Sequence, residues 1–296
     1  MDSLSHKDDD IVYFAECLAD RCPDVYWSAR LNLEAYGIRV RPIKDTQNIW
    51  VRDYMPIPVG DHFVKFVYDL SWAEQFPRSY VSKDSWSGEA DPVIESDIIL
   101  DGGNVVRAYG KTILTDKVVK QNGKDVLARL ERLLESEIII IPAEPGDHLG
   151  HSDGICKLVN SDTVLINDYS CIFDKDKRFV KYSEKLIKTL ESHNLNVLKF
   201  PYAYDAWDWT MPEKEWRKLF PYAYDYNPAF GYYINFLIAN HVILLPAMGL
   251  EKDREATEVL RPSYPNHHII LIDCRKLSME GGLINCITWT SKSKQI

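Results

Sequence analysis

Short apolar runs that resemble strands recur along most of the chain, separated by stretches with helical spacing. Strands are expected at 63–69, 112–119, 137–142, 162–168, 195–201, 241–248 and 267–274. Amphipathic helices are expected at 9–22 and 122–136. This alternation predicts an α/β fold assembled from repeated small units. Because no Gly/Ser-rich or Pro-rich linker interrupts it, residues 1–296 are expected to form a single domain.

The composition is that of a globular protein, with 46% hydrophobic and 27% charged residues. The opening "MDSLSHKDDD" is polar and acidic, which does not fit the basic and apolar start of a secretory signal. No apolar run approaches the roughly 20 residues that span a bilayer. We therefore expect a soluble, cytoplasmic protein that does not contact a membrane.

The charge balance bears on the kind of partner. A net charge of −9 argues against a nucleic-acid binder, which needs a basic face toward the phosphates. It is compatible with a small cationic substrate. The six cysteines lack the CxxC spacing of zinc sites and redox dithiols, and in a chain without a signal they should be reduced.

The segment "GDHLGHSDG" contains His148, His151 and Asp153 in an HxxHxD pattern. A metal site would usually need further ligands, and no second His or Cys cluster with ligand spacing occurs, so no metal is expected. If "HSDG" is extended, His151 and Asp153 lie two residues apart and point to the same face. That geometry would place a titratable imidazole beside a carboxylate.

Two further segments place an acid near a tryptophan or directly before two glycines. "NIWVRDYMP" places Arg52 and Asp53 next to Trp50, and an Arg–Asp ion pair at the end of an element explains it equally well. In "ILDGGNVV" an apolar run stops at Asp101 and two glycines follow. A carboxylate in this position serves a site about as often as it caps a turn.

Cys286 lies near the end of the chain in "GGLINCITW". Alone it favours a packing role, because free cysteine is among the most buried residue types. Together with His151 it is compatible with a nucleophile and its acid/base partner. A Cys–His hydrolase of peptide bonds would need to stabilise an oxyanion, which nearby acids oppose. Several acids instead favour a cation, and carboxylates bind a planar guanidinium through paired hydrogen bonds.

A five-residue sequence, "PYAYD", occurs at 201–205 and again at 221–225, flanking a tryptophan-rich segment. Five residues are too few for an architectural repeat. Two interpretations stay open: an aromatic loop that closes over a pocket, and plain packing of a long connection.

Taken in order, the motifs W-x-R-D, acid-G-G-N, G-H-x-D-G and G-G-x-I-x-C-I-T resemble those of the agmatine deiminase and bacterial-type peptidylarginine deiminase family. The segment "YYINFLIAN" is also similar to a family segment, and the match runs from about Asp45 to Thr290. The resemblance implies the pentein fold of the guanidine-modifying enzymes. In that fold five ββαβ-like units surround a pseudo-fivefold axis, with the site at the centre.

The resemblance also implies roles for individual residues. Cys286 would be the nucleophile, His151 the general acid/base, and Asp101 the hydrogen-bond partner of the histidine. The implied substrate-binding residues are Asp53, Asp153, Trp50 and Trp72. In the implied reaction the thiol attacks a guanidinium carbon, ammonia leaves, and water releases a ureido product from a covalent thiouronium. Neither a metal nor an organic cofactor is needed.

The chain departs from the family pattern at two of these motifs. Asp101 is one methylene shorter than the usual glutamate, so its bond to His151 is expected to need a backbone shift or a water. Asn285 stands where agmatine deiminases usually carry histidine. The segment around Trp72 also lacks the usual N-A-W-G-G.

Several functions therefore stay open. Agmatine is the first expected substrate, followed by peptidyl or free arginine, and an amidinotransferase is a related outcome. Free arginine would require a basic partner for its carboxylate, and the candidates are Arg30, Arg78, Arg107 and Arg178. A catalytically silent pentein used as a binding module is the alternative from a different class. A homo-oligomer is left open beside a monomer.

Overall fold

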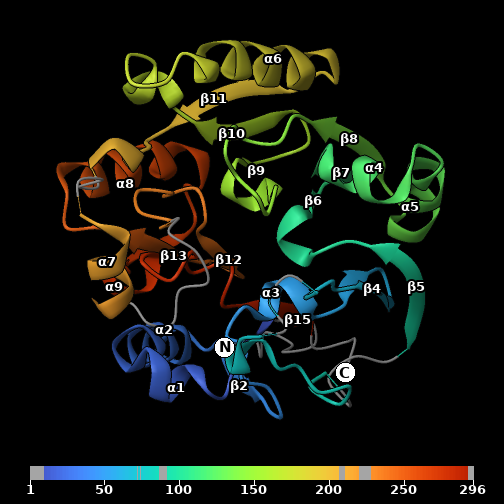
Figure 1. Ribbon diagram of the computed structural model, residues 1–296, viewed down its shortest axis with the longest axis vertical. Helices are drawn as coiled ribbons and strands as arrows, with labels where there is room; N and C mark the ends of the chain where they lie inside the picture. The colour runs from blue at the N-terminus through green and yellow to red at the C-terminus, as the bar shows by residue number, and fades with distance from the viewer. Residues whose placement is uncertain are drawn as a thin grey trace, which may run out of the picture.

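The computed structural model describes residues 10–71, 73, 75–86, 92–206, 211–219 and 228–292. Its strands form five three-stranded sheets, which follow one another along the chain around a common centre (Figure 1). Helices lie between the strands, as the alternation of apolar runs predicts. The five sheets confirm the expected α/β architecture of five small units.

Each sheet contains one antiparallel and one parallel pair of strands. The first sheet is formed by β1 (Asp10–Ala15), β2 (Arg39–Ile43) and β15 (Trp289–Lys292). The next two are formed by β3 (Ile57–Val59), β4 (His62–Val67) and β5 (Val93–Ile99), and by β6 (Val106–Ala108), β7 (Lys111–Thr115) and β8 (Glu137–Ile141). The last two are formed by β9 (Cys156–Leu158), β10 (Thr163–Asn167) and β11 (Asn196–Phe200), and by β12 (Leu237–Ala239), β13 (Val242–Ala247) and β14 (His268–Asp273).

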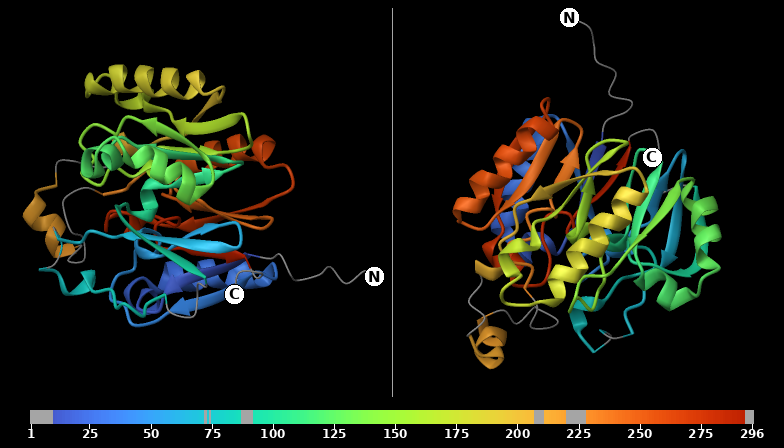
Figure 2. Two further views of the ribbon diagram at one scale, coloured as in Figure 1. Left: turned by 90° about the vertical axis from the view of Figure 1, so that its right-hand side faces the viewer. Right: turned by 90° about the horizontal axis from the view of Figure 1, so that it is seen from above.

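A parallel pair needs a crossover connection, and helices supply it in four of the sheets. These are α1 (Leu18–Arg21) with α2 (Pro23–Ala35), α4 (Lys117–Asn122) with α5 (Val126–Leu134), α6 (Arg178–Ser192), and α8 (Glu251–Ser263). Figure 2 shows α6 in yellow and α8 in orange-red at the periphery of the molecule. The other described α-helices are α3 (Val51–Tyr54), α7 (Glu213–Leu219) and α9 (Arg275–Ser278).

The apolar faces of these helices build the core between each helix and its sheet. Helix α6 buries Phe179, Tyr182, Leu186 and Leu190, which recur three to four residues apart, as an amphipathic helix requires. They pack in one cluster with residues of the third and fourth sheets, including Ile139. Because the helices cover the outer faces, the links between successive sheets converge at the centre.

Most of the predicted strands are confirmed to within two residues at either end, but two assignments are wrong. Residues 9–22, expected as one helix, form β1 and then the short helix α1. Strand β1 lies between β15 and β2 and is buried on both faces, so its continuous apolar run could not be told from a buried helix. The strand expected at 112–119 ends at Thr115, and helix α4 begins at Lys117.

The first and last strands of the chain share one sheet. Strand β15 pairs antiparallel with β1, with Asp10 opposite Lys292. Trp289 of β15 is fully buried, and its ring lies 4.9 Å from that of Tyr13 and 5.7 Å from that of Phe63. Its indole Nε1 donates a hydrogen bond of 2.7 Å to the Pro56 carbonyl. This side chain therefore connects the closing strand to the first two sheets.

Replacing Trp289 with alanine should lower the free energy of unfolding by about 3 to 5 kcal/mol, because it leaves a large cavity and an unpaired carbonyl. The matched control is Trp27→Ala, since Trp27 is 48% exposed, and its cost should stay below about 1 kcal/mol. Urea unfolding followed by circular dichroism measures both. Equal costs for the two tryptophans would contradict the closure described here.

Candidate active site

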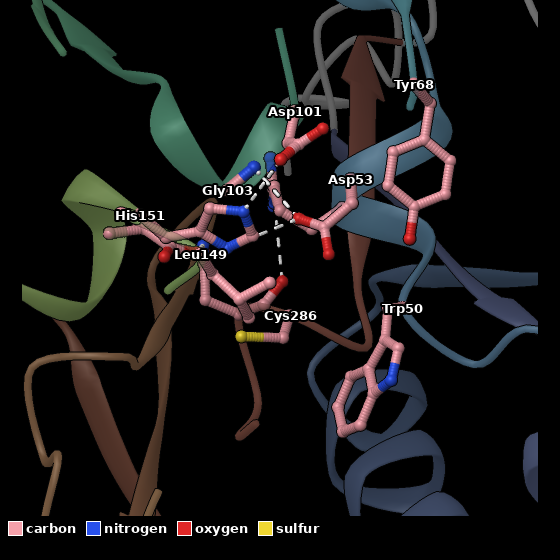
Figure 3. A network of polar contacts seen from close by, with 12 residues as sticks. Trp50, Asp53, Tyr68, Asp101, Gly103, Leu149, His151 and Cys286 are labelled. Atoms are coloured by element: carbon pink, nitrogen blue, oxygen red, sulfur yellow. Dashed lines mark hydrogen bonds and ion pairs between the residues drawn. The ribbon is translucent and has the colours of Figure 1, made fainter. Parts of the chain in front are cut away.

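The five links between successive sheets each place one polar side chain in a cluster at the centre. The links are 44–56, 100–105, 142–155, 274–288 and the described part of 201–236. The side chains, one from each link, are Asp53, Asp101, His151, Cys286 and Asn235. Figure 3 shows the first four of these coming together from separate parts of the chain.

The imidazole of His151 faces two carboxylates (Figure 3). Its Nε2 lies 3.2 Å from Asp101 Oδ2, and its Nδ1 lies 3.8 Å from Asp53 Oδ1. The Asp101 contact is direct, so the shorter side chain reaches the histidine without the water that the sequence suggested. Lys117 of α4 donates to the same Asp101 oxygen at 3.0 Å.

These contacts shift the proton affinities of the cluster. Burial opposes a charge on His151, but the Asp53 and Asp101 carboxylates outweigh it and raise the pKa of the imidazole to about 9. Burial also disfavours the Asp101 carboxylate, yet the hydrogen bond and charge of His151, together with Lys117, lower its pKa. Burial and the neighbouring acids raise the pKa of Asp53 to about 7. At neutral pH the histidine is therefore an imidazolium that can donate a proton.

Two glycines after Asp101 allow the links to approach each other. Gly103 donates its backbone N–H to Asp53 Oδ1 at 3.0 Å. A Cβ on Gly103 would lie 2.4 Å from His151 Nδ1 and 2.7 Å from Asp53 Oδ1, and a Cβ on Gly102 would lie 1.9 Å from the Arg52 carbonyl. Any side chain here would displace the imidazole or the backbone of α3, so the close packing of the links requires glycine at both positions.

Asp153 lies in a short 3-10 turn, Ser152–Gly154, that directly follows His151. The expectation that "HSDG" is extended is therefore wrong from Ser152 onward. Asp153 is 2% exposed, and its Oδ2 accepts a hydrogen bond of 2.7 Å from Asn285 Nδ2. Lys157 Nζ in turn lies 3.4 Å from Asn285 Oδ1. The asparagine that departs from the family pattern thus holds the Asp153 carboxylate in place.

The turn that carries Cys286 is fixed by Asn235. The Asn235 side-chain oxygen accepts from the backbone N–H of Asn285 at 3.1 Å and of Cys286 at 3.4 Å, and it also lies 3.4 Å from the Cys286 Sγ. The Cys286 carbonyl accepts from the Arg52 N–H at 3.1 Å. Burial and the charges of Asp153 and Asp53 raise the pKa of the Cys286 thiol well above its usual range, so it is a neutral thiol at neutral pH.

The Asp53 and Asp153 carboxylates are alike in how their oxygens are used. Asp53 Oδ1 contacts Gly103 and His151, and Asp153 Oδ2 binds Asn285. Within the part of the chain that the structure describes, the second oxygen of each accepts no protein hydrogen bond. The buried Asp153 and the largely enclosed Asp53 thus each retain one acceptor for a ligand near the thiol, and they would suit a cation with several N–H donors.

A cavity of about 360 Å³ opens onto this cluster. Its described lining includes Cys286, His151, Asp153 and Asn235. Tyr204 of the first "PYAYD" copy also lies on the wall, which favours the loop-over-pocket interpretation for that copy. The second copy and the neighbouring residues 207–210 fall outside the described ranges.

Of the two predicted tryptophans, the structure describes Trp50. Trp50 is 7% exposed and packs against Gly282, where a Cβ would come within 2.5 Å of its ring. Like Asp53 and Asp101, it is not among the described residues that line the cavity, although Gly282 is. Trp72 lies outside the described residues. A substrate-binding role for either tryptophan stays a prediction.

Two features that the described residues lack bear on other functions. In the ranges that the structure covers, no three His, Cys, Asp or Glu side chains are grouped so that they could hold a metal ion. Among the described helices, none is long and apolar enough to cross a membrane.

Sequence reasoning did not assign roles to Asn235 or Lys117, although both contact the cluster. Asn235 falls in the segment "YYINFLIAN", whose similarity to the family could have indicated it. Nothing comparable marks Lys117, since a lysine in the first turn of a helix is usually solvated. Their contacts join residues 16 and 51 positions apart in the chain.

Comparison with known proteins adds an independent finding. The model of the Porphyromonas-type peptidyl-arginine deiminase family matches residues 17–291 of this chain. The agmatine deiminase of Pseudomonas aeruginosa (strain LESB58) is 26% identical to it, over 89% of this chain and 79% of that protein.

Solved structures show the same fold. The agmatine deiminase of C. jejuni superposes with a TM-score of 0.70 at 15% identity, covering 97% of this chain and 95% of that one. The agmatine deiminase of Enterococcus faecalis gives a TM-score of 0.68 at 18% identity, covering 98% and 94%. The expected pentein fold is therefore confirmed.

The contact between Asp101 and His151 predicts a measurable proton affinity. In the wild-type protein the His151 ring should titrate near pH 9, and in Asp101→Asn its pKa should fall by about one pH unit or more. Histidine ring NMR signals, followed from pH 5 to 10, measure both. Asp116→Asn is the matched control, because Asp116 pairs with exposed Lys120. An unchanged His151 titration in Asp101→Asn would contradict the described contact.

Proposed function

The chain belongs to the Porphyromonas-type peptidyl-arginine deiminase family, and from that premise we propose that it hydrolyses agmatine to N-carbamoylputrescine and ammonia. It is a hydrolase that acts on the C–N bonds of linear amidines. The finer proposal names Cys286 as the nucleophile, His151 as the acid/base and a thiouronium on Cys286 as the intermediate. It requires neither a metal nor an organic cofactor, and it places the reaction in the cytoplasm.

One observation carries the proposal: the buried Asp153 and the largely enclosed Asp53, whose side chain is 11% exposed, lie near the Cys286 thiol with one acceptor oxygen each remaining. Burying such carboxylates is costly unless a cation pairs with them. A guanidinium supplies that charge, and its fixed N–H donors suit two carboxylates at its edges. Bound in this way, its central carbon would be presented to the thiol.

In the first half of the proposed reaction the Cys286 thiol loses its proton to water, and the resulting thiolate forms a bond to the guanidinium carbon. The positive charge of the substrate offsets Asp53 and Asp153, which lowers the pKa of the thiol on binding. The C–N bond then breaks, and His151, an imidazolium at neutral pH, gives its proton to the departing nitrogen. The products of this half are ammonia and a thiouronium on Cys286.

In the second half neutral His151 accepts a proton from water. The resulting hydroxide forms the new C–O bond, the S–C bond breaks, and the sulfur leaves as a thiolate. The hydroxyl proton of the intermediate passes to this thiolate and restores the neutral thiol, while His151 keeps the proton that it took from water. Asp101 and Lys117 act through the histidine: the Asp101 carboxylate orients the ring and stabilises its charge, and the lysine keeps that carboxylate ionised. The product carries a ureido group in place of the guanidine.

The charge of the cavity supports agmatine over free arginine. Its described lining has five acids, Glu144, Asp147, Asp153, Asp176 and Asp205, and two permanent cations, Lys175 and Arg178. Of the four arginines considered as carboxylate partners, Arg178 is the one among these lining residues, and it already pairs with Asp176 at 2.6 Å. The carboxylate of free arginine would therefore face a cavity wall with a net negative charge, which disfavours its binding.

A catalytically silent binding module fits the cluster less well. A scaffold has no use for buried carboxylates held close to a thiol and an imidazole, since each one destabilises the fold when it is unpaired. The polar contacts from all five links therefore support catalysis.

The direct test incubates the purified protein with agmatine, arginine, a capped arginine peptide and methylated arginines, and measures ammonia and the ureido or guanidino product. Agmatine should give ammonia and N-carbamoylputrescine, and Cys286→Ala should lower the rate at least about 10⁴-fold because the nucleophile is lost. Cys171→Ala, a partly buried cysteine outside the cluster, is the matched control and should keep the rate. No ammonia from any compound would refute the deiminase, and a new guanidino product from an added amine would indicate an amidinotransferase.

The raised pKa of Cys286 predicts slow alkylation of the empty site. Its reaction with iodoacetamide should speed up about tenfold per pH unit between pH 6 and 9, as the thiolate fraction grows. Asp153→Asn removes one cause of the raised pKa and should react faster at pH 7, whereas Asp162→Asn on an exposed turn should not. Peptide mass spectrometry resolves Cys286 from the other cysteines. Alkylation equally fast at every pH would disprove a neutral thiol.

A further inference from the structure

Glu144 is a buried acid in the link that leads to His151, and the proposed reaction does not use it. Its residue is 6% exposed, and it lines the same cavity as Cys286 and His151. It is separated from His151 by six residues, so this link carries two titratable groups on the cavity wall.

Three tyrosine hydroxyls from outside this link donate to the Glu144 carboxylate. Tyr232 donates to Oε1 at 2.6 Å and Tyr169 to Oε2 at 2.7 Å. Tyr202, in the first "PYAYD" copy, reaches Oε1 at 3.5 Å. Three neutral donors converging on two oxygens stabilise a carboxylate rather than a carboxylic acid, because each hydroxyl needs an acceptor. We call Glu144, Tyr169, Tyr202 and Tyr232 the tyrosine cage.

The tyrosine cage is connected to the turn that carries Asp153. A Cβ on Gly154 would lie 3.8 Å from Tyr232 Cδ1, so this ring packs beside Gly154 while its hydroxyl reaches Glu144. The Gly154 carbonyl accepts from Asn167 Nδ2 at 2.7 Å, and the same nitrogen lies 3.4 Å from the Tyr169 hydroxyl. The Tyr232 side chain therefore contacts Glu144 through its hydroxyl and lies beside the residue that follows Asp153.

The carboxylate in the tyrosine cage has donors but no counter-charge. In the part of the chain that the structure describes, no lysine, arginine or histidine nitrogen lies within ion-pair distance of Glu144. Burial and the charge of Asp147 raise its pKa to about 7, although the tyrosines oppose this. A buried carboxylate is stabilised most by a cation. Because Glu144 lines the cavity, a cation can reach its carboxylate from the cavity side.

The two cations on the cavity wall do not supply this charge. Lys175 lies 3.8 Å from Asp205, and Arg178 pairs with Asp176. Both pairs are largely solvated, and each is neutral as a unit, so they leave the cavity negative around Glu144.

We propose that the tyrosine cage is a second subsite, in which Glu144 binds an ammonium at the far end of a guanidino substrate. This inference rests on the proposed function and deepens it, because it makes Glu144 the residue that selects guanidines with a second cationic group. The guanidinium binds between Asp53 and Asp153, the alkyl chain passes Tyr232, and the ammonium contacts Glu144. Guanidines with a neutral or anionic tail are disfavoured.

The test compares agmatine with butylguanidine, which has the same alkyl chain without the ammonium. Wild type should favour agmatine in kcat/KM by about tenfold or more, the value of one charge-assisted contact. Glu144→Gln should remove this preference, mainly through a higher KM for agmatine, and should leave butylguanidine within about twofold. Equal losses on both compounds, or an unchanged KM for agmatine, would overturn the proposal.

A second variant distinguishes loss of the ammonium contact from a folding defect in Glu144→Gln. Tyr169→Phe removes one donor from Glu144 without touching the cavity lining, and it should weaken agmatine selectively by a smaller factor. Asp162→Asn is again the control that should change neither compound. The preference for agmatine should also rise in wild type as the pH passes about 7 and Glu144 gains its charge, and it should be flat in Glu144→Gln.

A binding measurement separates this inference from the proposed function. Isothermal titration of the Cys286→Ala protein with agmatine and with butylguanidine does not depend on turnover. In one outcome wild type releases no ammonia while Cys286→Ala binds agmatine more tightly than butylguanidine, and adding Glu144→Gln abolishes that difference in affinity. This combination would refute the deiminase reaction and support the subsite. Equal binding of the two compounds, or no binding of agmatine, overturns the subsite.

Discussion

The site depends on one electrostatic constraint: three carboxylates, largely shielded from water, gather around a single imidazolium and a neutral thiol. Burial alone would protonate or expel such acids, so each must be met by a donor. Asp101 accepts from His151 and Lys117, Asp53 accepts from the Gly103 N–H, and Asp153 accepts from Asn285. Because Gly103, His151 and Asn285 belong to three different links and Lys117 belongs to helix α4, the cluster depends on several units of the ring being in place together.

Closure of the ring therefore also positions the proposed nucleophile. Strand β15 pairs with β1, and the turn just before it carries Cys286. That turn is fixed by Arg52 from the first link and by Asn235 from the fourth, so the thiol is placed by residues 234 and 51 positions away in the chain.

The local sequence pattern predicted those strands whose formation depends on residues close together in the chain. Apolar runs marked β10, β11, β13 and β14 because these strands are bounded by turn signals. Doubly buried β1 was mistaken for a helix, since its pattern has no period. Motif resemblance selected Cys286, His151 and the acids, which the structure brings close together, but it did not indicate the contacts of Asn285, Lys117 or Glu144. Those depend on distances between links, which spacing along one chain does not encode.

The resting protonation state explains why so many acids surround a nucleophile. With the thiol neutral and the imidazole charged, the empty site is ready to donate a proton but not to attack. A neutral amide would leave Asp53 and Asp153 unpaired and the thiol pKa high, so it would not activate the cysteine. In the proposed reaction a guanidinium would satisfy both acids and lower that pKa as it binds. On this proposal, the electrostatics that make the empty site poorly nucleophilic would also restrict it to cationic substrates.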